Sequence, residues 1–174
     1  VAGYDLSNDT QALSRIGAPS ALLDVTGIDK SAIERVFGLY DGEIAFNVFF
    51  NDATDKAHLV LRTKPATDRI VAWFRGTAIG NKAAGLVAKQ INYDWTRGAD
   101  ASLIGSVQCL GNAFGLEYCD QLTAGKRTDG SATNGASYDN AAATALGIAG
   151  YLQVFAFTGT SVTVTIQESS DDAA

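Results

Sequence analysis

His58 is the only histidine of the chain, and it is the first residue to consider for acid–base or metal chemistry near neutral pH. No metal-ligand motif surrounds it, and no Gly-x-Ser-x-Gly elbow supplies a nucleophile for it to activate. Gly125-Lys126-Arg127-Thr128 resembles the end of a phosphate-binding loop, but the first glycine of that motif is missing. We interpret His58 as a polar surface or interface residue and the later segment as a turn.

Carboxylates are numerous enough to include an acid–base pair of the kind that glycoside hydrolases use. Asp94 with Asp100, and Glu117 with Asp120, could meet in space. Each pair flanks an expected turn, so solvated loop charges are the favoured interpretation. Asp171-Asp172 could ligate calcium only with partners that the sequence does not identify. The sequence therefore predicts no enzyme, no catalytic residue, no metal site and no cofactor.

Four aromatic residues could stack against a sugar ring on one face of a β-sheet: Trp73, Tyr93, Trp95 and Tyr118. Packing in a core or in an interface between subunits is the favoured interpretation of these side chains. A module that binds carbohydrate or a host surface nevertheless stays open as the alternative function.

The charge balance argues against a surface that binds nucleic acid. The 174 residues carry a formal net charge of −6, and the sequence pI is about 4.6. All of the acidic excess lies after residue 98, where Lys126 and Arg127 are the only bases. The sequence contains no run of about 20 apolar residues, so it predicts no membrane-spanning helix. Cys109 and Cys119 are interpreted as reduced thiols in a strand-rich core, with one bridge across a hairpin as the alternative.

Hydrophobic alternation at short intervals predicts an all-β sandwich or barrel with a short helix. Asp41-Gly42 predicts a turn before a strand that places Ile44, Phe46, Val48 and Phe50 on one face. Asp52 or Thr54 is expected to cap the helix, and residues 29–35 form either a helix-like patch or a turn. Strands are predicted over residues 21–27, 44–50, 69–75, 85–93, 101–110, 116–122, 151–157 and 161–167, and the helix over 57–61.

The strand predicted over residues 69–75 is apolar on both faces, which indicates burial on both sides or contact with another subunit. Strands that are rich in Val, Ile, Phe and Thr and poor in charge also favour lateral association. Both features are typical of a subunit in an assembly.

Residues 126–143 form a Gly-, Ser- and Asn-rich linker. We therefore predict a first domain over residues 1–125 and the start of a C-terminal β domain over 144–174. The predicted hairpin over 151–157 and 161–167 would be marginal alone in water. The chain end at 169–174 is expected to be a cut inside a longer protein.

Several segments resemble tail tube proteins (major tail proteins) of long-tailed bacteriophages, over about residues 20–130. They are Leu23-Asp24-Val25-Thr26-Gly27-Ile28, the run from Asp41 to Asn51 (DGEIAFNVFFN) and His58-Leu59-Val60-Leu61. The runs 88–94 (AKQINYD), 97–103 (RGADASL) and Gly115-Leu116-Glu117-Tyr118 resemble the proteins of actinobacterial phages.

The resemblance implies a structural virion protein with a β-sandwich of tail-tube type. Such subunits form hexameric rings that stack into a tube, and DNA passes through it without specific binding. Other tail proteins, the tape measure and the terminator, would be its partners. The protein would reside in the virion tail after assembly in the cytoplasm of the bacterial host.

Within such a tube we expect a neutral to acidic channel wall, because a basic wall would bind phosphates. The candidate channel-facing acids are Asp100, Glu117, Asp120 and Asp129, and the candidate subunit-contact residues are Val71, Trp73 and Tyr93. Lys126 and Arg127 are expected at a loop or at a contact between rings.

Overall fold

The structure is a computed structural model that describes residues 1–141 and 147–167. Its regular secondary structure is almost entirely β, with one short helix, which confirms the predicted all-β class. The elements are β1 (Thr10–Gly17), β2 (Ser20–Asp24), β3 (Arg35–Tyr40), β4 (Glu43–Phe49), α1 (Ala57–Leu61), β5 (Arg69–Phe74), β6 (Lys82–Arg97), β7 (Leu103–Gly111) and β8 (Glu117–Asp120).

One antiparallel sheet holds most of the strands, in the order β1-β4-β7-β6-β5, and β8 pairs with the beginning of β6. The long strand β6 belongs to two layers. Its first half pairs with β5 and β8, and its second half pairs with β7. A bulge between Gln90 and Asn92 separates the halves, and bulges of this kind bend a strand. The sheet is not closed into a barrel.

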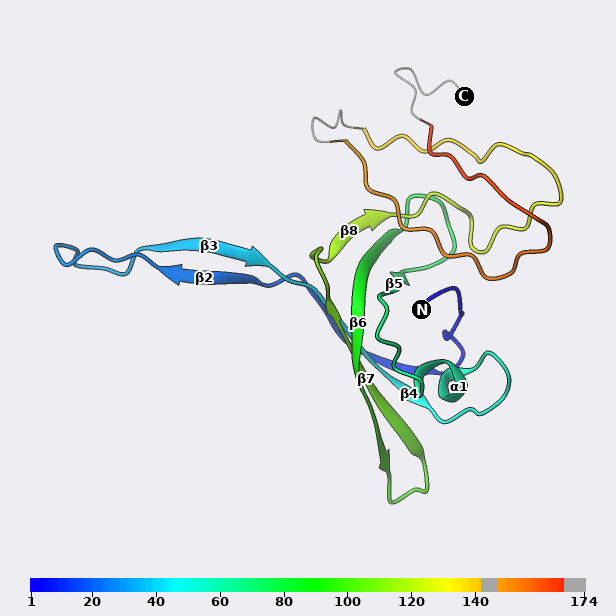
Figure 1. Ribbon diagram of the computed structural model, residues 1–174, viewed down its shortest axis with the longest axis horizontal. Coiled ribbons are helices and arrows are strands. Elements are labelled where there is room, and N and C mark those ends of the chain that lie inside the picture. Colours follow the sequence, from blue (N-terminus) through cyan, green and yellow to red (C-terminus); the bar gives the residue numbers. More distant parts are fainter. Residues whose placement is uncertain (142–146, 168–174) are drawn as a thin grey trace.

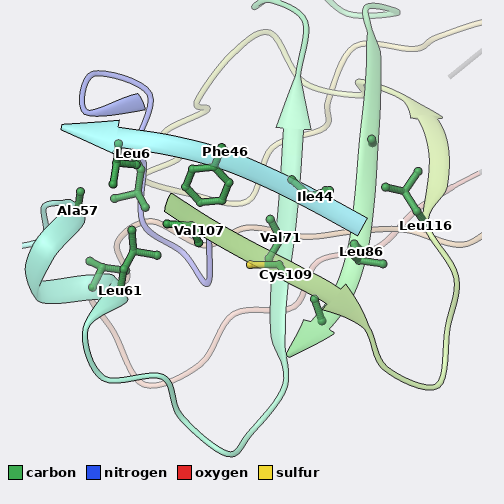
Figure 2. Close-up of a cluster of buried hydrophobic side chains, with 14 residues drawn as sticks. Leu6, Ile44, Phe46, Ala57, Leu61, Val71, Leu86, Val107, Cys109 and Leu116 are labelled. Atoms are coloured by element: carbon green, nitrogen blue, oxygen red, sulfur yellow. The ribbon is translucent and has the colours of Figure 1, made fainter. Parts of the chain in front are cut away.

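The hydrophobic core lies between these two layers. In Figure 2, β4 and β7 run across β5 and β6, with buried side chains between them. Ile44, Phe46 and Val48 point into this core from β4, as their alternation predicted. Helix α1 and Leu6 close one side of the core. Phe50 was predicted to share the buried face, but it follows the last residue of β4 and is 41% exposed.

Helix α1 forms where it was predicted, but its cap is different. Neither Asp52 nor Thr54 caps it, and Lys56 at the N-cap position makes no side-chain bond. Instead, Asp9, buried and 48 residues away, accepts a 2.9 Å hydrogen bond from the Ala57 backbone N–H. The second carboxylate oxygen of Asp9 accepts a bond from the Asn51 amide at 2.8 Å. A side chain from the N-terminal segment thus supplies the missing acceptor at the helix end.

The segment after β2 forms a connecting turn and no helix, with the Lys30 N–H bonded to the Gly27 carbonyl. Residues 29–34 form the irregular tip of a hairpin, and Arg35–Tyr40 form β3, which was not predicted. Strand β3 pairs with β2 from Asp24↔Arg35 to Ser20↔Tyr40. The backbone bond from Asp41 N–H to Pro19 C=O links this hairpin to the β1–β4 pair. The β2–β3 pair thus continues from the β1–β4 pair and extends away from the body of the molecule (Figure 1).

The predicted C-terminal hairpin does not form in the described residues. Neither 151–157 nor 161–167 contains a strand. Residues of the first of these segments bind the body instead: Gln153 donates to the Ile70 carbonyl and accepts from the Gly3 N–H, and the Tyr151 ring lies against Gly85. These contacts with the body are made in place of the predicted hairpin, which would be only marginally stable by itself in water. The division into domains stays a prediction.

Candidate self-assembly interface

The ribbon formed by β2, β3 and their connecting tip, residues 20–40, is the most unusual surface of the molecule, and we call it the arm. In Figure 1 it extends far from the sheet, and no other labelled element lies beside it. Its two strands pair only with each other. A two-stranded hairpin is marginally stable alone in water, so its side chains decide whether it has another partner.

The arm carries large apolar side chains that the described part of the chain leaves exposed. The strand register distributes them over both of its faces. Leu22 lies opposite Phe37 on one face, and Leu23 lies opposite Val36 on the other. The exposed fraction reaches 74% for Phe37 and 86% for Leu39. The exposed apolar residues are Leu22, Leu23, Val25, Ile28, Ile33, Val36, Phe37, Leu39 and Tyr40.

Polar residues gather at the tip of the arm and fix its conformation. Asp24 accepts hydrogen bonds from the Thr26 N–H and hydroxyl, and these bonds hold the pKa of the Asp24 carboxyl below its usual value. Lys30 and Glu34, four residues apart in the sequence, form an ion pair. The tip is thus ordered by local bonds, although Val25, Ile28 and Ile33 are exposed there, and the exposed apolar side chains of the stem have no partner in the described chain. This is the pattern of an interface that another molecule covers.

The three predicted subunit-contact residues do not lie on the arm. Val71 is 2% exposed and packs in the core of its own chain, so its side chain has no surface to offer a partner. Trp73 and Tyr93 are half-buried against the same core. Burial raises the pKa of the Tyr93 phenol to about 12. A role of Trp73 and Tyr93 in subunit contact stays a prediction.

The four predicted channel acids lie on three separate parts of the chain. Asp100 is in the turn between β6 and β7, where it accepts bonds from the Ser102 N–H and hydroxyl. Glu117 and Asp120 lie on β8, which pairs with the opposite end of the 16-residue strand β6, about 50 Å away along an extended chain. Asp129 lies in the segment after β8.

Three of these acids are engaged locally, and the bonds lower the pKa of each carboxyl. The Lys82 ammonium lies 2.7 Å from Asp120, and the Arg127 guanidinium lies 2.8 Å from Asp129. The Ser102 hydroxyl has the same effect on the pKa of Asp100. Their role as channel-facing residues stays a prediction.

Lys126 is the last residue of a bend, and Arg127 follows in irregular chain. This agrees with the interpretation of residues 125–128 as a turn. Gly125 has a φ of +62°, and Lys126 forms a 2.7 Å ion pair with Asp5. The Lys126 ammonium also lies 5.4 Å from the centre of the Phe155 ring. These contacts connect the segment after β8 to the N-terminus and to residues near 155.

His58 joins an aromatic cluster that sequence spacing did not reveal. Its ring lies 4.7 Å from the Phe50 ring, and its Nδ1 is 3.3 Å from the Tyr93 hydroxyl. Tyr93 and Trp95 meet edge to face with centroids 4.8 Å apart. The two remaining candidates for sugar stacking lie on other strands, Trp73 on β5 and Tyr118 on β8. The four therefore form no common stacking platform.

The candidate carboxylate pairs and the two thiols lie on or beside strands β6 to β8. Asp94 lies on β6, whereas Asp100 lies in the turn that follows it, and Asp120 is paired with Lys82. Cys109 and Cys119 are free, as interpreted, and burial raises the pKa of the Cys109 thiol to about 11. Among residues 1–141 and 147–167, no three His, Cys, Asp or Glu side chains gather as a metal site. Asp171-Asp172 lies outside the described residues. No described helix is long and apolar enough to cross a bilayer.

Comparison with solved structures finds chains of similar fold. No family model and no curated protein matches the chain. A chain in the solved structure described as "Tail of empty GTA particle computed with helical refinement, C6 symmetry" matches with a TM-score of 0.49 and 12% sequence identity. The match covers 64% of this chain and 82% of that chain. At this identity and TM-score, the likeness carries no argument on function.

Proposed function

We propose that this protein is a self-assembling structural subunit whose arm packs between other copies of the same chain. The observation that carries the proposal is the arm, which is apolar on both faces and uncovered by the described residues. Full burial of one large apolar side chain contributes about 1.5–3 kcal/mol. Covering much of the arm would therefore supply on the order of 10 kcal/mol before the cost of association. A second copy is the simplest occupant, because assemblies of identical subunits are the commonest oligomers.

The specific assembly that we propose is the tail tube of a long-tailed phage, of the actinobacterial-phage type. The sequence resemblance over residues 20–130 supports this choice. Hexameric rings would stack into a tube in the virion tail, formed in the host cytoplasm, with the tape measure and terminator as partners and DNA as the passing cargo. Six copies of the four strands β1, β4, β7 and β6 would give about 24 strands. At about 4.8 Å per strand, this closes a circle about 37 Å across.

Negative-stain microscopy and sedimentation of the purified chain test the proposal. We expect rings or tubes, and we expect their loss in the double variant Phe37→Ser/Leu39→Ser. Both side chains are mostly exposed in the single chain, so the variant should keep the β-sheet circular dichroism spectrum of the wild type. Tyr118→Ser removes an equally exposed aromatic outside the arm, and it should assemble normally.

Two results would contradict the proposal. Wild-type chains that stay compact monomers at high concentration would favour the alternative, a module that binds carbohydrate or a host surface. A Phe37→Ser/Leu39→Ser variant that still forms rings or tubes would show that the arm does not carry the assembly.

A further inference from the structure

Asn134-Gly135 is the only place in the sequence where a glycine follows an asparagine. Both residues lie in exposed, irregular chain after β8. Among the described residues, none forms a hydrogen bond with the Asn134 side-chain amide or with the Gly135 N–H. Glycine also has no Cβ that would hinder an approach to its backbone nitrogen. The Gly135 nitrogen and the side-chain carbonyl carbon of Asn134 are therefore free to react with each other.

The Arg127 guanidinium lies on the peptide group that joins these two residues. Its Nη2 donates to the Asn134 main-chain carbonyl at 2.9 Å, and a Cβ at Gly135 would lie 3.0 Å from its Nη1. Asp129 fixes the guanidinium through a 2.8 Å ion pair. The Thr133 hydroxyl accepts a bond from Arg127 and donates to Asp129 at 2.8 Å. These bonds hold a positive charge at the oxygen of the Asn134–Gly135 peptide.

This charge matters because a peptide nitrogen attacks a carbonyl carbon only after it has lost its proton. The negative charge of the deprotonated peptide resides mainly on its carbonyl oxygen. A donor that is already aimed at this oxygen stabilises the charge as it develops. Bonds from a cationic donor are also stronger than bonds between neutral groups. Arg127 therefore favours the form of the Gly135 nitrogen that can attack the Asn134 side chain.

We propose that Asn134-Gly135 is a modification site that deamidates spontaneously and that Arg127 promotes the reaction. The Gly135 nitrogen gives its proton to hydroxide from the solvent and bonds to Cγ of Asn134. The bond from Cγ to the side-chain amide nitrogen breaks, and this nitrogen takes a proton from water and leaves as ammonia. Water then opens the resulting cyclic imide at either carbonyl, which gives aspartate or isoaspartate. The net reaction is hydrolysis of one amide, and it places a new carboxylate beside Arg127.

Peptide mass spectrometry of the purified full chain, incubated at mildly alkaline pH, tests the proposal. We expect the peptide that contains residue 134 to become one mass unit heavier and to include isoaspartate, detected with an isoaspartate methyltransferase. Asn112 is the internal reference, because its amide is bonded to Asp68 and it precedes Ala113, so it should stay unmodified. Residue 134 should react at least about three times faster in the native chain than in urea, because only the native fold places Arg127.

Two variants separate the bond from the general effect of positive charge. Arg127→Gln should slow the native reaction at least about threefold. Lys126→Gln is the matched control, because it removes a neighbouring positive charge that is bonded to Asp5 and not to Asn134. It should react as fast as the wild type, and all three chains should react at similar rates in urea.

The proposed site is wrong if Asn134 is modified no faster than Asn112. The role of Arg127 is wrong if native Arg127→Gln reacts as fast as the wild type, or if Lys126→Gln slows the reaction equally. Equal rates in the native and unfolded wild type would contradict that role without the use of any variant.

Discussion

At the scale of single residues, position relative to the strand ends decides which aromatic side chains stabilise the fold. Phe46 is 5% exposed in the middle of β4, whereas Phe50 lies just beyond the strand and contacts His58 and Trp95. Both residues occupy the same phase of the alternating pattern in the sequence. Alternation alone therefore does not separate a core residue from a residue at the border of the core.

We expect Phe46→Ala to lower the free energy of unfolding by about 3–5 kcal/mol, because it leaves a cavity in the core. Phe50→Ala is the matched control, and its loss of partly exposed ring contacts should cost roughly 1 kcal/mol. Urea unfolding followed by tryptophan fluorescence measures both values. Equal losses in the two variants would mean that Phe50 is as well packed as Phe46.

The two thiols should differ in reactivity for the same reason of placement. Burial raises the pKa of the Cys109 thiol to about 11 and also raises that of Cys119, which is less buried. The thiolate is the reactive form, so Cys109 should stay unmodified by an aromatic disulfide reagent at pH 8 until the chain unfolds. Cys119→Ser should abolish the slow native reaction, whereas Cys109→Ser should leave it unchanged. Rapid modification of native Cys119→Ser would contradict the buried position of Cys109.

At the scale of elements, the turn between β3 and β4 connects the arm to the body. The Asp41 carboxylate accepts a hydrogen bond from the Gly42 N–H at 2.7 Å. A Cβ at Gly42 would lie 2.5 Å from the Leu116 backbone nitrogen and 2.6 Å from the Leu86 Cδ1 atom. Only glycine allows this approach of the turn to the core, which is why the Asp-Gly pair is found here.

Gly42→Ala should therefore destabilise the chain by about 1–3 kcal/mol, the usual cost of overpacking. Gly130→Ala is the matched control, since nothing lies within 4 Å of a Cβ at that position. The control should change stability by less than about 1 kcal/mol. Thermal melts of the two variants give the comparison, and a Gly42→Ala protein that melts with the wild type would contradict the close approach.

At the scale of the whole molecule, the two ends of the described chain are connected by polar contacts. Asp5 pairs with Lys126, and Gln153 bonds to both Gly3 and Ile70. The Lys126 ammonium, with help from the Ser7 hydroxyl, holds the pKa of the Asp5 carboxyl far below its usual value. The folded pKa is depressed, so the pair contributes stability above pH 4, and this contribution is lost as the pH falls from about 4 toward the folded pKa.

We expect hydrogen exchange in residues 147–157 to be similar at pH 7 and pH 5, after correction for the intrinsic rates, and to accelerate below pH 4. Asp5→Asn removes the charge, so its exchange at pH 7 should already resemble that of the wild type below pH 4. Asp139→Asn is a control acid that forms no ion pair with Lys126. If residues 147–157 exchange as slowly in Asp5→Asn as in the wild type at pH 7, contacts other than the Asp5–Lys126 pair hold this segment.

The sequence by itself determined the all-β class, the strand β4 and the short helix, and it favoured reduced cysteines while leaving one bridge open. The class, the strand and the helix depend on alternation and turn residues, which are local. It did not determine β3, the Asp9 cap, the place of Val71 in the core or the lack of a C-terminal strand pair. Each of these depends on which distant segment is the partner, and local pattern does not encode that choice. Only the tertiary structure showed that residues 20–40 extend away from the body and that their apolar side chains are exposed, because exposure is a property of the whole fold.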